Sequence, residues 1–248
     1  MVDKVGEDNA VITFEAGGNK TSEEKSIENH KVGLGCIVKL LLDEKNGLIK
    51  NTSEVSAIGH RVVHGGDRFS KTILINDEVK SGIRELFSLA PLHNPPNLNG
   101  IELAGELFPE AKQVAVFDTA FHQTIPLKAY KYAIPNNFLD AHGIRLYGFH
   151  GTSHKYVSEK AIAYLGQVNT KMICIHLGNG CSMTAIKDGK SIDHSLGFGP
   201  MNGLIMGTRA GDIDQSVVLH LMNSLGYSVN EVNTLLQKQS GMLGFDRL

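Results

Sequence analysis

Strand-type and helix-type segments alternate along the first half of this chain, and this alternation limits the folds open to it. Residues 55–64 and 114–117 are rich in β-branched and apolar residues, as buried strands are. Between them, apolar residues recur at helical spacing over residues 79–87, behind Asn76 or Asp77, either of which can cap a helix. Alternating strands and helices predict an α/β layer architecture.

Other segments of the first half extend this pattern. A strand is predicted at residues 11–15 and a helix over residues 32–41. A second helix is predicted over residues 100–108. Before it, three prolines predict an irregular loop around His93: Pro91, Pro95 and Pro96.

The second half contains turn signals and helix caps. Two strands, residues 172–177 and 181–186, flank a glycine-rich turn, and Asp188-Gly189 predicts a hairpin that returns as a third strand. One helix is predicted to start near Asp214, and another at Ser228, where Glu231 completes a capping box.

The chain is expected to form two lobes that meet near residue 150. Thr152 or Ser153 is predicted to cap a helix that opens the second lobe. We therefore expect a domain boundary near residue 150, between an N-terminal part and a C-terminal part.

Four short runs combine glycine or small residues with titratable or cationic side chains: residues 59–66, 117–123, 147–154 and 206–209. Glycine lets a backbone approach a ligand closely, and Arg and His supply the positive charge that an anionic ligand needs. The four runs together predict a single polyanion site assembled from distant segments.

Within these runs, each candidate also has a structural interpretation. Arg61 can hold a carboxylate or phosphate through two bonds, or form a surface salt bridge. Asp118 closes a strand at its carboxyl end, where open α/β sheets place ligand groups, but it can also cap or form a turn. His150 lies at the expected lobe junction and can donate to a transferring phosphoryl oxygen. Arg209 precedes a helix that Asp212 or Asp214 can cap.

The remaining candidates allow metal-binding or phosphate-binding interpretations. His150 and His154 have the spacing of a zinc pair but lack a third ligand in the sequence. His122 can be a ligand, a partner or a core residue. The segment from His176 to Gly180 can cradle phosphates through backbone N–H groups, or be an ordinary hairpin.

Composition removes several function classes. The net charge of −2 gives no general attraction to nucleic acid or to anionic membranes. No apolar run approaches the length of a membrane-spanning helix, and the start has no signal-peptide pattern. The three cysteines have no metal-ligand spacing and favour a reducing, cytoplasmic setting. P-loop, protein-kinase and hydrolase-elbow motifs are missing from the sequence.

Six long strings resemble the acetate kinase family, in the family's order: residues 59–66, 90–96, 116–123, 147–156, 176–180 and 206–214. The resemblance implies the two-lobed α/β fold of sugar kinases, heat-shock chaperones and actin, here incomplete. Residues 1–150 would then be an N-terminal lobe that lacks its first strands, and residues 151–248 would be the beginning of the C-terminal, nucleotide-binding lobe. It also implies Mg²⁺-dependent phosphoryl exchange between ATP and acetate, and a homodimer.

The resemblance also assigns roles to residues. Asp118, His150 and Arg209 would be catalytic, with His150 and Arg209 stabilising the phosphoryl group in flight. ATP phosphates would contact His176, Leu177, Gly178, Asn179 and Gly180. The substrate would contact Arg61, Val63, Leu92, His93, Phe149 and Pro200, with Val63, Leu92, Phe149 and Pro200 forming the pocket for the methyl group.

Compared with the family, the chain is expected to be truncated at both ends. The family's N-terminal serine-rich phosphate loop and its late adenosine-binding segment and magnesium-binding Glu find no counterpart here. Three functions therefore remain open: an acetate kinase, a propionate or butyrate kinase, and a non-catalytic remnant of such a kinase.

Overall fold

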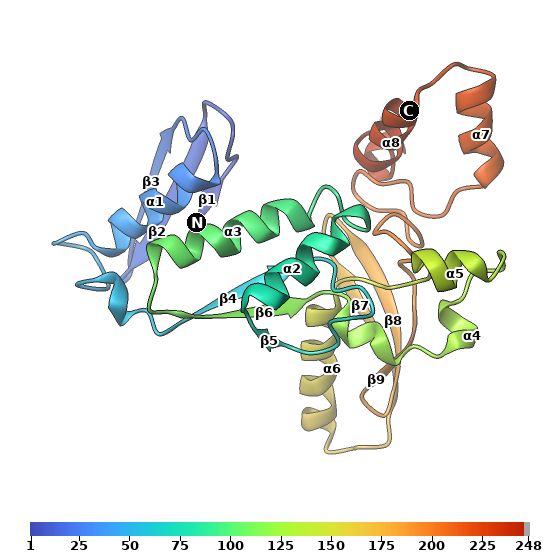
Figure 1. Ribbon diagram of the computed structural model, residues 1–248, viewed down its shortest axis with the longest axis horizontal. Coiled ribbons are helices and arrows are strands. Elements are labelled where there is room, and N and C mark those ends of the chain that lie inside the picture. The colour runs from blue at the N-terminus through green and yellow to red at the C-terminus, as the bar shows by residue number, and fades with distance from the viewer. Residues whose placement is uncertain (246–248) are drawn as a thin grey trace. The chain divides into compact units, whose positions relative to one another are not determined.

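The computed structural model describes residues 1–245, and residues 246–248 lie outside the described part. The described chain divides into two compact units (Figure 1). The first unit contains Met1–Arg61, Ile73–Glu85 and Leu92–Ala115. The second unit contains Val62–Thr72, Leu86–Pro91 and the chain from Val116 onward.

The first unit begins with a small antiparallel sheet. Its strands β1 (Val2–Asp3), β2 (Ala10–Ala16) and β3 (Asn19–Lys25) lie in the order β1-β2-β3. Helix α1 (His30–Leu41) follows and packs Cys36 and Leu40 onto the buried side chains of this sheet. The strand predicted at 11–15 and the helix predicted at 32–41 are confirmed. The sequence did not indicate β3, because all of its residues are polar or charged.

The central sheet has the order β4-β6-β5, formed by β4 (Ala57–Val62), β5 (Ile73–Leu74) and β6 (Lys112–Phe117). Helices α2 (Asp77–Glu85) and α3 (Asn94–Leu107) accompany it, with short 3-10 turns at Thr52–Glu54 and Leu86–Ser88. The strands predicted at 55–64 and 114–117 are confirmed.

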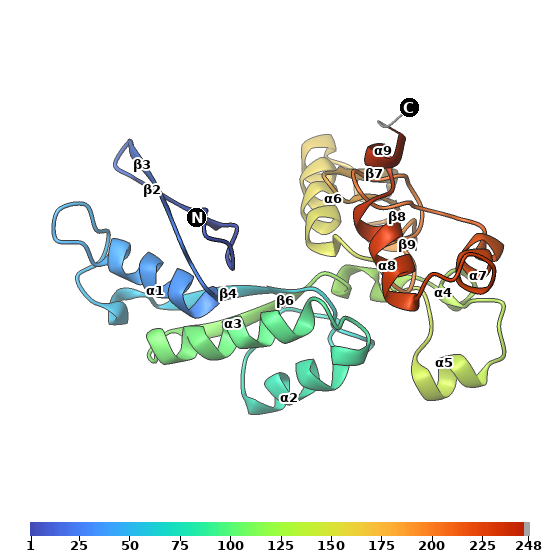
Figure 2. The same cartoon turned by 90° about the horizontal axis from the view of Figure 1, so that it is seen from above.

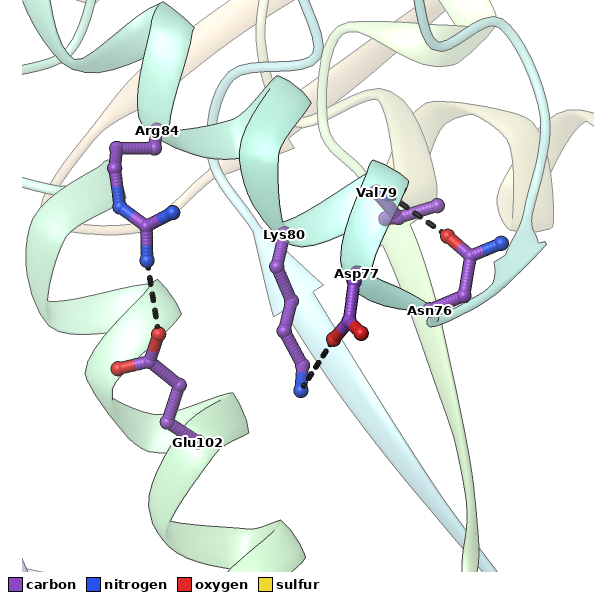
Figure 3. Close-up of polar contacts among 6 residues, drawn as sticks. All are labelled: Asn76, Asp77, Val79, Lys80, Arg84 and Glu102. Atoms are coloured by element: carbon purple, nitrogen blue, oxygen red, sulfur yellow. Dashed lines mark hydrogen bonds and ion pairs between the residues drawn. The ribbon is translucent and has the colours of Figure 1, made fainter.

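Helix α2 is capped and joined to α3 by polar side chains (Figure 3). The Asn76 side chain accepts a hydrogen bond of 2.9 Å from the Val79 N–H, as the predicted cap requires. Arg84 forms an ion pair of 3.1 Å with Glu102 of α3. Both side chains of this pair are largely exposed, so it contributes little to stability.

The loop predicted around His93 is wrong in its second half. Helix α3 begins at Asn94 and contains Pro95 and Pro96 in its first turn. The first N–H groups of a helix have no partner within the helix, so proline loses nothing there. His93 itself is the N-cap residue, without a capping bond from its side chain.

The second unit is built on a three-stranded antiparallel sheet. Strands β7 (Lys171–Leu177), β8 (Cys181–Lys187) and β9 (Lys190–His194) lie in the order β7-β8-β9, which confirms the three predicted strands. Figures 1 and 2 show helix α6 (Gly151–Leu165) alongside β7. The shorter elements before α6 are a 3-10 turn at Ala120–Thr124, α4 (Leu127–Tyr130) and α5 (Asn137–His142).

The caps of the last helices are confirmed. Helix α7 (Gln215–Asn223) starts after Asp214, whose side chain accepts from the Ser216 N–H. Helix α8 (Val229–Lys238) has the complete capping box of Ser228 and Glu231, and α9 (Met242–Phe245) follows. Among the helices that the structure describes, none is long and apolar enough to cross a membrane.

The predicted cap of α6 is wrong. The N-cap position is held by His150 instead of Thr152 or Ser153, and its side chain makes no capping bond. His150 has a left-handed backbone, with φ of 57°. Such a conformation is uncommon for a residue with a side chain and persists only where the surroundings enforce it.

Candidate functional site

The backbone around His150 is tied to the end of β6. The Gly151 N–H donates to the carbonyl oxygen of Asp118 over 2.9 Å, and the Asp118 N–H donates to Val62 over 3.0 Å. Asp118 is 1% exposed. A Cβ added at Gly151 would overlap the Asp118 carbonyl oxygen, so only glycine allows this approach. One buried carboxylate residue therefore anchors both the strand and the start of α6.

Two buried imidazoles hold the peptide of Phe149, immediately before His150. The Phe149 N–H donates to Nε2 of His194 over 3.1 Å, and the Phe149 carbonyl oxygen lies 2.9 Å from Nε2 of His122. A carbonyl can only accept, so His122 carries its proton on Nε2, whereas Nε2 of His194 is bare. Their other nitrogens bond to Ser191 Oγ and Thr184 Oγ1. The two histidines are thus neutral and of opposite tautomers.

Burial keeps this histidine cluster uncharged. The rings of His122 and His194 lie 4.1 Å apart, and those of His154 and His194 lie 5.3 Å apart. Burial, which is the largest cause, and repulsion from neighbouring imidazoles together lower the pKa of His122 and of His154 to about 4. The pKa of His194 is lowered by the same two causes. A charged imidazole here would be desolvated beside its neighbours.

Arg209 and His150 converge on the backbone of Gly180. A Cβ added at Gly180 would lie 3.4 Å from Nη1 of Arg209 and 3.4 Å from both Cε1 and Nε2 of His150. The Arg209 Nη1 also donates to the carbonyl oxygen of Pro200 over 2.8 Å. Burial lowers the pKa of Arg209, although an arginine in a protein stays cationic at neutral pH. A guanidinium and an imidazole therefore face one glycine.

The turn between β7 and β8 is held from two sides. The Gly178 N–H donates to the carbonyl oxygen of Gly180, and the Gly207 N–H donates to that of Asn179, each over 3.1 Å. The ring of His176 stacks on that of His150 with centroids 4.2 Å apart. A pocket of about 590 Å³ opens beside this turn, lined by Asn179, Gly207, Thr208, Met242, Leu243 and Phe245. Leu177 is 77% exposed.

Two predicted substrate residues share a buried apolar cluster. Val63 and Phe149 pack with Leu196 and Met206, and Cys181 contacts the cluster. Three others belong to the first unit: Arg61, Leu92 and His93. That these three approach the residues of the second unit stays a prediction.

The zinc interpretation of the His150 and His154 pair finds no support in the geometry. Both imidazoles bond to the hydroxyl of Ser182. Within residues 1–245, no group of three or more His, Cys, Asp or Glu side chains is placed to hold a metal. Sequence reasoning missed Ser182 and His194, because alternation along a strand does not distinguish a buried polar partner from any other inward residue.

The chain is similar to acetate kinases over its whole length. The family model described as "Acetokinase family" matches residues 1–248. The acetate kinase of Flavobacterium johnsoniae is 62% identical over 244 residues, which are 98% of this chain and 62% of that protein. The acetate kinase of Methanosarcina mazei is 49% identical, with 100% of this chain and 62% of that protein covered.

Solved structures agree with the sequence comparison. Porphyromonas gingivalis acetate kinase matches with a TM-score of 0.89 and 45% identity, over 98% of this chain and 62% of that one. A propionate kinase from Francisella tularensis subsp. tularensis SCHU S4 matches with a TM-score of 0.92, 46% identity and the same coverage. The predicted actin-like α/β fold, in incomplete form, is confirmed. The chain spans about 62% of the length of these relatives, and it belongs to the acetokinase family.

Proposed function

We propose that this chain carries the phosphoryl-transfer region of an acetate kinase, which moves phosphoryl reversibly from ATP to acetate. The observation that carries the proposal is the convergence of Arg209, His150 and the backbone of Gly180. A guanidinium and an imidazole directed at one backbone segment suit a group that carries several anionic oxygens. The names of the similar proteins support acetate as the acceptor.

The chemistry requires little beyond positioning and charge. A carboxylate substrate is already ionised at neutral pH, so no general base has to activate it. Catalysis then rests on alignment and on stabilising charge at the transferring group. We assign that stabilisation to Arg209 and His150, contacts with ATP phosphates to the segment from His176 to Gly180, and the substrate carboxylate to Arg61.

Magnesium would enter bound to the phosphates of ATP. The described residues hold no cluster for an all-protein site, and Mg²⁺ commonly binds proteins through substrate phosphates and one or two carboxylates. When bound, the ion neutralises phosphate charge. We assign Asp118 the orientation of an arginine or of a magnesium-bound water. A homodimer and a cytoplasmic setting belong to the same proposal.

Propionate is the second candidate substrate, favoured by the likeness to the propionate kinase structure. We assign the acyl pocket to Val63, Leu92, Phe149 and Pro200. One methylene in an apolar pocket changes selectivity by only about 1–3 kcal/mol. Parallel kcat/KM values for acetate, propionate and butyrate separate these substrates.

Arg209→Ala is expected to lower acyl phosphate formation from acetate and MgATP by about 100-fold, because one preorganised donor at the transferring group is lost. The assay uses the purified 248-residue chain. Arg84→Ala is the matched control, since Arg84 is exposed on α2 and pairs only with Glu102 in Figure 3. A folded chain without turnover would instead favour a non-catalytic remnant.

Asp118→Asn is expected to lower turnover by at least about tenfold and to raise the magnesium concentration needed for half-maximal rate. The amide keeps the shape of the buried side chain but removes the charge that orients a cationic partner. Titrating magnesium at saturating ATP measures both effects. Normal turnover with normal magnesium dependence would contradict the role proposed for Asp118.

A further inference from the structure

We propose that Ser182 and His154 are positioning residues that hold His150 as the neutral tautomer with its proton on Nε2. The catalytic meaning of this inference rests on the proposed function, whereas the tautomer itself does not.

The Ser182 hydroxyl lies between two imidazoles. Its Oγ is 2.8 Å from Nδ1 of His150 and 2.7 Å from Nε2 of His154, and Ser182 is 0% exposed. A hydroxyl has one proton, so it can donate to only one of these nitrogens. The other nitrogen must donate to the oxygen.

The burial of His154 decides which nitrogen donates. Nδ1 of His154 is buried and has no hydrogen-bond partner among the described residues. An unpaired buried N–H is rarer and more costly than an unpaired acceptor. The proton of His154 therefore sits on Nε2 and is donated to Ser182.

Because its oxygen accepts from His154, Ser182 donates its own proton to His150. Its own proton points at Nδ1 of His150, which must be a bare acceptor. The proton of His150 is consequently on Nε2. The nearby Arg209 guanidinium opposes a second proton on the same imidazole, because two cations would face the same glycine.

In this tautomer the Nε2–H of His150 is a hydrogen-bond donor on the side where a transferring phosphoryl group would lie. Nε2 of His150 faces Gly180 on the same side as Nη1 of Arg209. In the opposite tautomer, a bare lone pair would face the oxygens of a transferring phosphoryl group and repel them. His122 and His194, which bond to the Phe149 peptide, fix the backbone that carries the His150 ring. The hydrogen bonds of His154 and Ser182 thus determine that the His150 ring presents an N–H donor, and not a bare nitrogen, towards Gly180.

Nitrogen NMR of the ¹⁵N-histidine-labelled chain at pH 7 tests the tautomer directly. Two-bond proton–nitrogen correlations distinguish a protonated Nε2 from a protonated Nδ1, and loss of signals in His150→Gln assigns the ring. The expected result is a bare Nδ1 and a protonated Nε2 in His150. A proton on Nδ1, or on both nitrogens, would overturn the proposal whether or not the chain is active.

Variants test whether Ser182 is responsible. Ser182→Ala is expected to give both tautomers of His150, and Ser182→Thr to restore the Nε2–H form. Ser158→Ala is the matched control, since Ser158 is also buried but donates only to the Lys155 carbonyl of its own helix. An unchanged His150 signal in a folded Ser182→Ala chain would contradict the proposal that Ser182 fixes the tautomer of His150.

Turnover provides a second readout for an active chain. Ser182→Ala is expected to lower kcat about tenfold with KM for acetate unchanged, and Ser182→Thr to recover it, because a wrong tautomer removes a transition-state donor without removing a substrate contact. Equal losses in Ser182→Ala and in the Ser158→Ala control would contradict the positioning role. Failure of the proposed function shows itself separately, as absent turnover in a chain whose NMR signals report the expected tautomer.

Discussion

The second unit is expected to lose most of its stability between pH 7 and pH 5. Four buried histidines contribute: His64, His122, His154 and His194, all between 0% and 6% exposed. The pKa of each of the first three is lowered to about 4, with burial as the largest cause, and the pKa of His194 is lowered as well. In the unfolded chain each imidazole titrates at its ordinary pKa of about 6.5.

These lowered pKa values make the folded chain less stable as the pH falls. Below pH 6.5 these histidines bind protons in the unfolded chain, whereas in the folded chain they stay neutral down to about pH 4. Folding stability therefore is fully present above the unfolded pKa and falls as the pH drops through this window. His122, His154 and His194 face one another, so a proton on one ring also repels the next. His64 instead faces the rings of Tyr147 and Phe149.

The expected loss is about 2 kcal/mol for each histidine between pH 7 and pH 5, and about 8 kcal/mol for the four together. This is comparable to the whole stability of an ordinary domain. Urea unfolding at several pH values measures it, followed by far-UV circular dichroism because the chain has no tryptophan. Hydrogen bonds lower the pKa values of Asp43, Asp214 and Glu231, and the contribution of these carboxylates to stability is lost only below pH 5.

An exposed histidine provides the control. His220 lies on the exposed surface of α7, so His220→Gln should leave the pH dependence unchanged. A free energy of unfolding that is equal at pH 7 and pH 5 would contradict the neutral, buried state of the cluster. Imidazole NMR signals of His122 titrating near pH 6.5 would do so as well.

The histidine cluster also marks where sequence reasoning stopped. Local signals predicted the strands β7 to β9 and the caps Asp214 and Ser228, because turn and capping preferences act within a few residues. The pairing of His122 with His194 joins residues 72 positions apart in an antiparallel sheet and a 3-10 turn. Nothing local announces such a contact, so the partners that hold the Phe149 peptide were not predicted.

The start of α6 was predicted wrongly for the same physical reason, which is a contact between residues far apart in the sequence. Thr152 and Ser153 have the chemistry of good N-caps, yet the helix begins earlier, because the Gly151 N–H already has a partner in Asp118, 33 residues before it. A tertiary bond replaced the local cap. The candidate residues His150, Arg209 and the 176–180 segment were predicted from composition and resemblance, and the structure brings them together within the second unit.

Gly151→Ala is expected to destabilise the second unit by about 3 kcal/mol or more, at the upper end of the cost of overpacking a close contact. The added Cβ would overlap the Asp118 carbonyl oxygen and lie 3.1 Å from its carbonyl carbon and 3.2 Å from Cβ of Phe121. Backbone cannot move aside as a flexible side chain can. Thermal unfolding should show a midpoint lowered by about 6–12 °C.

Thr152→Ala separates this clash from a general sensitivity of the first turn of α6. Thr152 is exposed and does not cap the helix, so its loss should change stability by less than about 0.5 kcal/mol. A loss near 1 kcal/mol would instead match the cap that the sequence predicted. If Gly151→Ala proves as mild as Thr152→Ala, the Gly151 to Asp118 bond does not fix the start of α6. His150 would then owe its left-handed backbone to the histidines that hold Phe149 alone, and Asp118 would no longer be the anchor that joins β6 to His150.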